Sequence, residues 1–185
     1  MRSPRAGEVV QTTGARGGIA MRSCAVSAGR NKTVLGKAGV GRLNEPGLAD
    51  QLLSNARTIA MVGYSDKPHR PVTSVSAYLR SQGYRVIPVN PRLRGREVDG
   101  EQAYDRLVDI PKDVTIDFVD VFRRGEFLDE TVDDAIAAGA PAIWFQLDLE
   151  NVAAAERAER AGLKVVWDRC TAVEHRRMRM ERRSC

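Results

Sequence analysis

Five apolar runs of strand length alternate with segments of helical periodicity between residues 44 and 175. The runs are Thr58–Gly63, Tyr84–Asn90, Ile116–Phe122, Ala142–Gln146 and Leu163–Asp168. Short apolar runs bounded by turn residues are typical of strands that are buried on both faces. Strands that alternate with helices pair in parallel through right-handed crossovers. We therefore predict a single α/β domain, a doubly wound and Rossmann-like parallel sheet of five strands in the order 3-2-1-4-5.

The segments around these runs carry helix signals, such as a proline in the first turn or a glycine just beyond the end. We predict helices at Pro46–Leu53, Pro71–Gln82, Glu126–Ala138 and Asn151–Ala161, and a short helix near Glu101–Leu107 in the polar linker after the second run. Pro88 lies inside the second run and cannot donate to a strand ladder. We expect that strand to loosen there.

The charge of the chain is unevenly distributed. The net charge is +5 over 185 residues, but residues 1–43 carry +7, residues 176–185 carry +4, and the part between them carries −6. An acidic body is a poor electrostatic partner for a nucleic acid, so we expect no nucleic-acid ligand. No run approaches the roughly 18 apolar residues of a membrane helix, so we expect no membrane span.

Residues 1–43 are rich in Gly, Arg, Ser and Ala and have no sustained apolar period. This composition is typical of a disordered tail, but it also resembles a targeting segment. An overlong start is a third interpretation, since Met21 offers an internal initiation site. We predict a disordered tail at 1–43, one domain at 44–175 and a basic C-terminal tail at 176–185.

The cysteines are three, widely spaced and odd in number: Cys24, Cys170 and Cys185. They do not form a disulfide framework, and they are too few for a zinc site made of cysteines alone. We therefore expect a cytoplasmic protein without a metal site.

Basic residues cluster where the predicted strands end. In open α/β sheets, ligands bind outside the carboxyl ends of the strands. Seven cations follow these ends: Lys67, Arg70, Arg92, Arg94, Arg123, Arg124 and Arg169. A helix N-terminus after the first strand would add backbone N–H donors for a phosphate. The pattern predicts a phosphate-bearing ligand at this edge.

Two loops narrow the choice of ligand. The loop from Gly63 to Arg70 matches neither the G-x-G-x-x-G fingerprint nor a P-loop. After the second strand, NAD-binding sites place an acidic residue on the ribose, whereas this chain has Asn90-Pro91-Arg92. An arginine there suits a phosphorylated ribose. NADP and coenzyme A (CoA) both contain one, and both remain open on these residues.

Five blocks of the sequence carry a family resemblance. They are, in order, VGYSDKPHRP, RVIPVNP, VDVFRR, WFQLDLENVAAAERAERAGL and DRCTAVEH. Together they resemble the small CoA-binding proteins, which are single Rossmann-type domains similar to the CoA-binding domain of the succinyl-CoA synthetase α subunit. The resemblance runs from about Ala56 to His175 and implies that CoA or an acyl-CoA is the ligand.

The resemblance also suggests three groups of binding residues. Ser65, Asp66, Lys67 and Pro68, next to Gly63, would face the pyrophosphate. Asn90, Pro91 and Arg92 would border the adenosine and its 3′-phosphate. The far wall would consist of Phe122, Arg123, Trp144, Gln146 and Leu147.

The chain departs from the family pattern at two places. Relatives tend to have a Ser-Tyr pair where this chain has Val72-Thr73. They also tend to have glycine where this chain has Asp148, and an acid beside a pyrophosphate is unfavourable. The second departure concerns the loop after the fourth strand, which the resemblance alone does not place relative to the pyrophosphate.

Catalytic interpretations are weaker than structural ones. Ser65 has no G-x-S-x-G surroundings and is better explained as a phosphate contact or a helix cap. Cys170 and His175 could approach each other, but such a pair needs a third group and a cleft. Trp144, although included in the far wall, and Trp167 lie on predicted strands and are also core candidates. We predict no catalytic residues.

Three functions are compatible with the sequence. The first is a CoA-binding or acyl-CoA-binding module without self-contained catalysis, so the chain is more a binding protein than an enzyme. The second is an NADP-binding oxidoreductase or redox sensor on the same fold. The third is a subunit that supplies the CoA site to a larger acyl-CoA ligase, and either a homo-oligomer or a ligase partner is compatible with this sequence.

Overall fold

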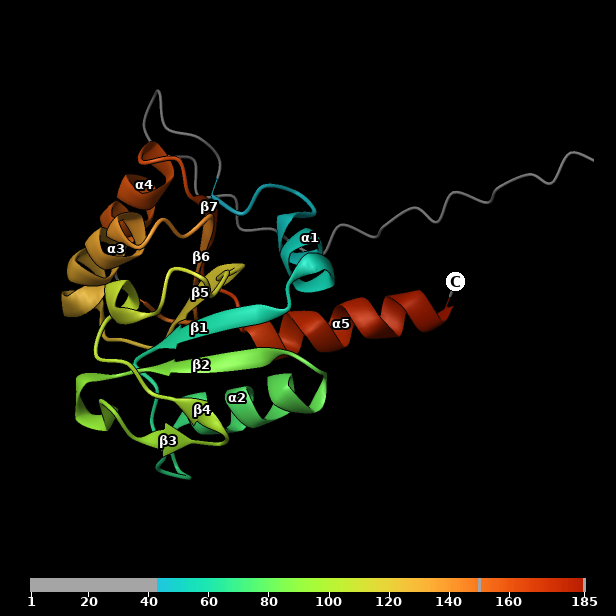
Figure 1. Ribbon diagram of the computed structural model, residues 1–185. Coiled ribbons are helices and arrows are strands. Elements are labelled where there is room, and N and C mark those ends of the chain that lie inside the picture. Colours follow the sequence, from blue (N-terminus) through green and yellow to red (C-terminus); the bar gives the residue numbers. More distant parts are fainter. Residues whose placement is uncertain (1–42, 150, 185) are drawn as a thin grey trace, which may run out of the picture.

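The computed structural model describes residues 43–149 and 151–184, which form a five-stranded parallel sheet between two layers of helices (Figure 1). The strands pair in the order β2-β1-β5-β6-β7. Their bounds are Thr58–Val62 (β1), Arg85–Val89 (β2), Phe118–Val121 (β5), Ala142–Phe145 (β6) and Lys164–Val166 (β7). The α/β, Rossmann-like fold predicted from the apolar runs is confirmed.

The two faces of the sheet have separate cores because successive strand residues point to opposite sides. Ile59 and Met61 of β1 pack with one set of helices, and Ala60 and Val62 pack with the other. The first set comprises α1 (Leu48–Asn55), α2 (Pro71–Ser81) and α5 (Thr171–Ser184), and the second comprises α3 (Leu128–Ala137) and α4 (Val152–Arg160). Figure 1 shows these two layers on either side of the sheet.

The predicted strand order 3-2-1-4-5 is wrong. The third long strand, β5, pairs with β1 rather than beyond β2, so the order of the five long strands is 2-1-3-4-5. The outer edge of β2 is already occupied: Tyr104 donates its N–H to the Pro88 carbonyl and accepts from the Asn90 N–H, at 3.0 and 2.8 Å. The topological switch point therefore lies between β1 and β5.

The segment between β2 and β5 differs from its prediction. Instead of a helix near residues 101–107, it contains a small hairpin, β3 (Glu97–Val98) with β4 (Glu101–Gln102), and two 3-10 turns, η1 (Pro91–Leu93) and η2 (Leu107–Asp109). The expected loosening at Pro88 is absent, because β2 stays in register with β1 through the Met61–Pro88 pair. Tyr104 is the residue through which this segment covers the edge of β2.

The N-terminal end of the described chain packs on the domain, whereas the last residues of helix α5 are mostly exposed. Leu43 is 3% exposed, and the Asn44 side chain bonds both backbone polar groups of Trp167. The basic segment expected as a tail continues helix α5 as far as Ser184, with Met178 buried. The rest of the predicted tail, 1–42, lies outside the described residues. Among the residues that the structure describes, no helix is long and apolar enough to cross a membrane.

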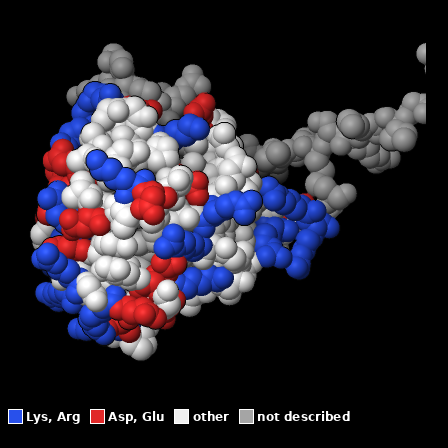
Figure 2. All heavy atoms as spheres, in the orientation of Figure 1, with Lys and Arg blue, Asp and Glu red and all other residues white. Residues whose placement is uncertain are grey.

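The surface charges follow the distribution along the sequence. In Figure 2, basic side chains concentrate over the projecting end of α5, whereas acidic and basic side chains are mixed over the rest of this face. Arg177 on α5 is paired with Asp50, Glu174 and Glu181.

Candidate functional site

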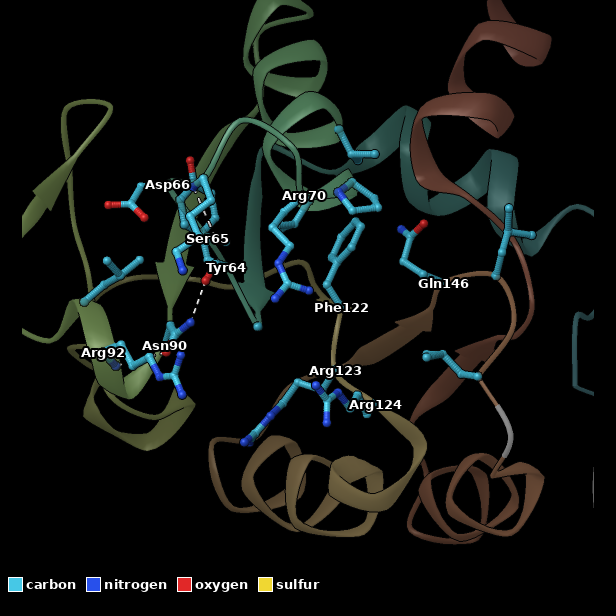
Figure 3. Close-up of a pocket in the computed structure, with 18 of the residues that line it drawn as sticks. Tyr64, Ser65, Asp66, Arg70, Asn90, Arg92, Phe122, Arg123, Arg124 and Gln146 are labelled. Atoms are coloured by element: carbon cyan, nitrogen blue, oxygen red, sulfur yellow. Dashed lines mark hydrogen bonds between the residues drawn. The ribbon is translucent and has the colours of Figure 1, made fainter.

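A cleft of about 1020 Å³ lies at the carboxyl edge of the sheet. The loops after β1, β2, β5, β6 and β7 all contribute to its lining, together with the first turns of α2. Figure 3 shows these side chains converging from the different loops around one hollow. This is the edge at which the sequence predicted a ligand.

Glycine at position 63 brings two of these loops together. Gly63 has a positive φ of 82°, and a Cβ atom there would lie 2.7 Å from the Phe122 carbonyl oxygen. A side chain does not fit in this gap and is strained at this φ. The predicted site residues Gly63 and Phe122 therefore form the contact at which the β1 loop meets the end of β5.

The loop after β1 is fixed by hydrogen bonds from its neighbours. The Thr73 hydroxyl lies 2.9 Å from the Ser65 carbonyl and 2.7 Å from the Lys67 carbonyl, and it donates its single hydrogen to this pair. The Asn90 amide donates to the Tyr64 carbonyl at 2.6 Å, and its oxygen accepts from the Arg92 N–H at 3.0 Å (Figure 3). Asn90 thus ties the loop after β1 to η1.

Thr73 also accounts for one departure from the family pattern. Its hydroxyl fixes the loop from the first turn of α2, and its neighbour Val72 is buried with an apolar surface on the cleft.

The basic side chains of the cleft differ in their pairing. Arg96 lies 3.3 Å from Asp66, and Arg123 lies 3.5 Å from Glu130. Arg124 pairs with Glu126 at 3.7 Å. Within residues 43–149 and 151–184, no carboxylate lies within ion-pair distance of the remaining cations of the lining, which are Lys67, Arg70 and Arg92. These three cations remain available to an anion.

A buried polar network lies under the end of the cleft formed by β6 and the loop before α5. The Gln146 amide donates to Asp120 at 2.7 Å and lies 3.0 Å from the Thr171 hydroxyl, which itself donates to Asp120 at 2.9 Å. Burial raises the pKa of Asp120 to about 7, against the opposing effect of these hydrogen bonds. Asp120 is absent from the predicted site, because only the fold brings it under Gln146.

Most of the sequence-predicted site residues lie together. Ten of them line the cleft: Gly63, Ser65, Asp66, Lys67, Asn90, Arg92, Phe122, Arg123, Gln146 and Leu147. Three do not line it. Pro68 is an exposed residue of the β1 loop, Pro91 borders the adjoining hollow of about 460 Å³, and Trp144 is fully buried with its indole N–H donated to the Arg169 carbonyl.

Several lining residues were not among the predicted contacts. The Tyr64 side chain is buried in the protein, and its hydroxyl donates a hydrogen bond to Asp99 at 2.5 Å. Val72 and Val75 give the cleft an apolar wall from α2, and Cys170 lies at its far end. The sequence showed that α2 has an apolar face and that Cys170 follows the fifth run. It did not show that these residues line the cleft.

The residues considered for catalysis have structural roles. His175 is buried between the rings of Tyr78 and Tyr84, at centroid distances of 5.6 and 5.5 Å, and its Nδ1 bonds the Tyr78 hydroxyl at 2.9 Å. Burial and three nearby arginines lower the pKa of His175. Ser65 accepts a hydrogen bond from the Lys67 N–H at 3.2 Å within the loop, but it does not cap helix α2, whose N-cap residue is Arg70.

Comparison with known proteins agrees with this geometry. Residues 57–176 match the family described as CoA binding domain. The chain belongs to this family. It is 37% identical over 125 residues to the uncharacterized protein YneT of Bacillus subtilis (strain 168), covering 68% of this chain and 90% of YneT.

Two solved structures place the domain among its relatives. A Thermus thermophilus protein, cell-free ID.343, is 41% identical, with a TM-score of 0.65 over 70% of this chain and 95% of that one. The dinucleotide-forming acetyl-coenzyme A synthetase 1 of Ca. Korarchaeum cryptofilum is 23% identical, with a TM-score of 0.53 over 62% of this chain and 26% of that one. The second likeness shows a shared fold only.

Proposed function

We propose that this CoA-binding domain protein binds CoA or an acyl-CoA in the cleft at the carboxyl edge of the sheet, as a binding module without self-contained catalysis. The observation that carries the proposal is the group Lys67, Arg70 and Arg92, which line the cleft without a carboxylate partner in the described part of the chain. Cations without a carboxylate partner beside a helix N-terminus suit a ligand with several phosphates.

The shape of the cleft supports the same ligand. Its basic lining residues come from the loops after β1, β2 and β5, and its lining also includes Val72, Val75, Leu147 and Cys170. CoA combines a phosphorylated nucleotide with a long and weakly polar arm, so the residues present fit the two parts of this molecule. Arg92 at the end of β2 would meet the 3′-phosphate, and Lys67 the pyrophosphate.

The location and partners of the protein are part of the proposal. Cys170 is a free thiol in the structure, which suits a reducing compartment such as the cytoplasm. A homo-oligomer or a ligase partner subunit is compatible with the domain, and light scattering with and without CoA measures the first of these.

A panel of four ligands tests the proposal by calorimetry and thermal shift. CoA should bind and stabilise the protein by about 2.7 kcal/mol at 100 times its dissociation constant. Dephospho-CoA should bind more weakly because Arg92 loses its phosphate partner, and NAD should not bind. An affinity for NADP that equals or exceeds that for CoA would overturn the proposal in favour of an NADP-binding protein.

A further inference from the structure

A second hollow, of about 330 Å³, lies between helices α1 and α5, and none of its described lining residues belongs to the cleft. Leu53, Ser54 and Met178 form part of its wall. The other lining residues are basic or titratable: His175, Arg179, Arg182 and Arg183. Figure 2 shows basic side chains concentrated over this end of α5. The α1–α5 hollow therefore gathers positive charge at a place that the proposed CoA site does not use.

Two of these arginines are held in place by neutral acceptors. Arg182 donates to the Ser54 hydroxyl oxygen at 2.6 Å, and Arg179 donates to the side-chain oxygen of Gln82. A guanidinium group has five N–H donors, so each arginine keeps most of its donors for another partner. Because the acceptors carry no charge, these hydrogen bonds orient the two guanidinium groups without neutralising them.

The acidic residues of the two helices are engaged by another arginine. Arg177 pairs with every acid that α1 and α5 contain, at 2.5 to 3.1 Å: Asp50, Glu174 and Glu181. Within residues 43–149 and 151–184, no carboxylate lies within ion-pair distance of the three arginines of the hollow. The C-terminal end of a helix is equivalent to only about half a negative charge. Most of the charge of the three guanidinium groups is therefore uncompensated in this part of the chain.

His175 adds a buried polar side chain to the α1–α5 hollow. The residue is 5% exposed, and its Nδ1 bonds the Tyr78 hydroxyl at 2.9 Å. Its Nε2 has no hydrogen-bond partner within the described residues, yet it is not among their fully buried unpaired atoms, so it reaches the surface. With the Tyr78 hydroxyl as donor to Nδ1, the neutral ring carries its hydrogen on Nε2. Nε2 is thus a donor that His175 offers to the hollow.

The arginines act on this imidazole. Burial, together with the charges of three arginines that include Arg179 and Arg182, lowers the pKa of His175. An anion among these groups would oppose both effects, since it would neutralise the arginines and favour the charged imidazole. The occupancy of the hollow by an anion can therefore be read at His175.

We propose that the α1–α5 hollow is a second anion site, which takes the phosphate group of a small molecule on Arg179, Arg182, Arg183 and the imidazole of His175. A phosphate has several acceptor oxygens and can accept from guanidinium groups on more than one side. The site shares no described residue with the cleft, so it does not depend on CoA binding. Inorganic phosphate and glycerol 3-phosphate are the probes, the second standing for a phosphate monoester.

Imidazole proton NMR on the full chain without CoA tests this site, because the chain contains only two histidines. His175 reports on the hollow, and His69, in the loop after β1, reports on the cleft side. Either probe should raise the pKa of His175 by about 0.5–1 relative to sodium chloride at equal ionic strength. The variant His69→Gln assigns the two resonances. A pKa of His175 that responds to the probes no more than to sodium chloride would overturn the proposal.

Variants of the arginines test which groups hold the anion. Arg183→Gln changes an exposed residue that forms no hydrogen bond or ion pair within the described residues, so the fold should be unaffected. It should weaken phosphate binding, followed at His175, by about fivefold, and the double variant Arg179→Gln/Arg182→Gln should abolish the response. Arg160→Gln, on α4 and outside the hollow, is the matched control and should keep the affinity. Unchanged affinity in both hollow variants would overturn the assignment, as would a response lost in Lys67→Ala, which changes only the cleft.

Discussion

Gly63 and Phe122 touch across the ends of β1 and β5, at the centre of the cleft edge. The Phe122 N–H donates to the Val62 carbonyl at 2.8 Å, and this bond brings the Phe122 carbonyl under Gly63. A Cβ at position 63 would lie 2.7 Å from that oxygen and 2.9 Å from its carbon. The loop after β1 can therefore approach β5 only with glycine at this position.

Gly63→Ala should lower the free energy of unfolding by about 2–4 kcal/mol, because alanine adds a backbone clash to the strain of a positive φ. Gly100→Ala is the control: Gly100 has a φ of 79° and no heavy atom within 4 Å of its ideal Cβ position. Gly100→Ala should lower the free energy of unfolding only by the strain of a positive φ, about 1–2 kcal/mol. Urea unfolding of the two variants measures the difference, and equal losses would contradict a clash at Phe122.

Asp120 should make stability depend on pH in a direction opposite to that of most carboxylates. Burial raises its pKa to about 7, so the folded protein keeps a proton that the unfolded chain has lost above about pH 4. The contribution of Asp120 is therefore fully present below pH 4 and is lost as the pH rises through 7.

The variant Asp120→Asn isolates this effect. The free energy of unfolding of the wild type, relative to that of Asp120→Asn, should fall between pH 4 and pH 8 by an amount on the order of 3 kcal/mol. Urea unfolding of both proteins at four pH values gives the two curves. Parallel curves would show that Asp120 titrates as an ordinary exposed aspartate.

The sequence was a good guide to the elements and a poor guide to how two of them pair. Each apolar run forms a strand, because a run buried on both faces has few other solutions. The strand order failed at the polar segment after β2, where Tyr104 closes the edge of that strand through backbone bonds that no side-chain pattern encodes. Helix α5 was missed because its charged residues conceal a short buried stripe, His175 and Met178 among them.

The sequence could predict which strand ends form the candidate site, but not which side chains there pair with each other. Lys67 and Arg92 could be assigned to the cleft because parallel strands end at one edge. The sequence could not show that Asp66 is paired with Arg96 across the loop. Nor could it show the Asp120–Gln146 bond, since those residues are 26 positions apart and meet only through the pairing of β5 with β6.

Asp148→Gly should improve both folding and binding. Asp148 has a φ of 60°, in the left-handed region that glycine adopts easily, at a position where the family pattern suggested glycine. It also lines the cleft, so its carboxylate faces the proposed polyanion. The variant should bind CoA about two- to fivefold more tightly, a change worth roughly 0.4–1 kcal/mol.

Calorimetry at low and high salt separates the charge effect of Asp148 from the backbone effect. Asp148→Asn removes the charge and tolerates the same φ, so it should give the gain in CoA affinity without the full gain in stability. A gain in affinity for the glycine variant alone would assign the effect to the backbone.

Lys67→Ala should weaken CoA binding by roughly ten- to a hundredfold, because a charge-assisted hydrogen bond is worth about 1.5–3 kcal/mol. Asp66, its acidic neighbour, is already paired with Arg96, so Lys67 has no carboxylate partner within the described residues. The loss should shrink at high salt, where the native contact is itself screened. Lys112→Ala, which changes an exposed lysine outside the cleft, should leave the affinity unchanged.

Calorimetry on the three proteins at two salt concentrations decides this point. Thermal unfolding without ligand should be nearly the same for all three, since an exposed loop lysine buries little surface. If Lys67→Ala binds CoA as tightly as the wild type, the phosphates lie elsewhere in the cleft, and Arg92 and Arg123 are the cations to test next.

Two truncations should separate the N-terminal segment from the domain. Leu43 packs in the core formed with α3 and α4, and Asn44 bonds both the N–H and the carbonyl of Trp167, at 2.8 and 2.9 Å. Deleting residues 1–44 should therefore lower the free energy of unfolding by about 3–5 kcal/mol.

Deleting residues 1–42 instead keeps both contacts. It removes a segment with seven net positive charges and no sustained apolar period, so the free energy of unfolding should change by less than about 0.5 kcal/mol. CoA affinity should also stay the same, because every described residue that lines the cleft follows position 62. Urea unfolding and calorimetry on the two truncated proteins make the comparison, and a large loss in the shorter deletion would mean that residues 1–42 contribute to the folded domain.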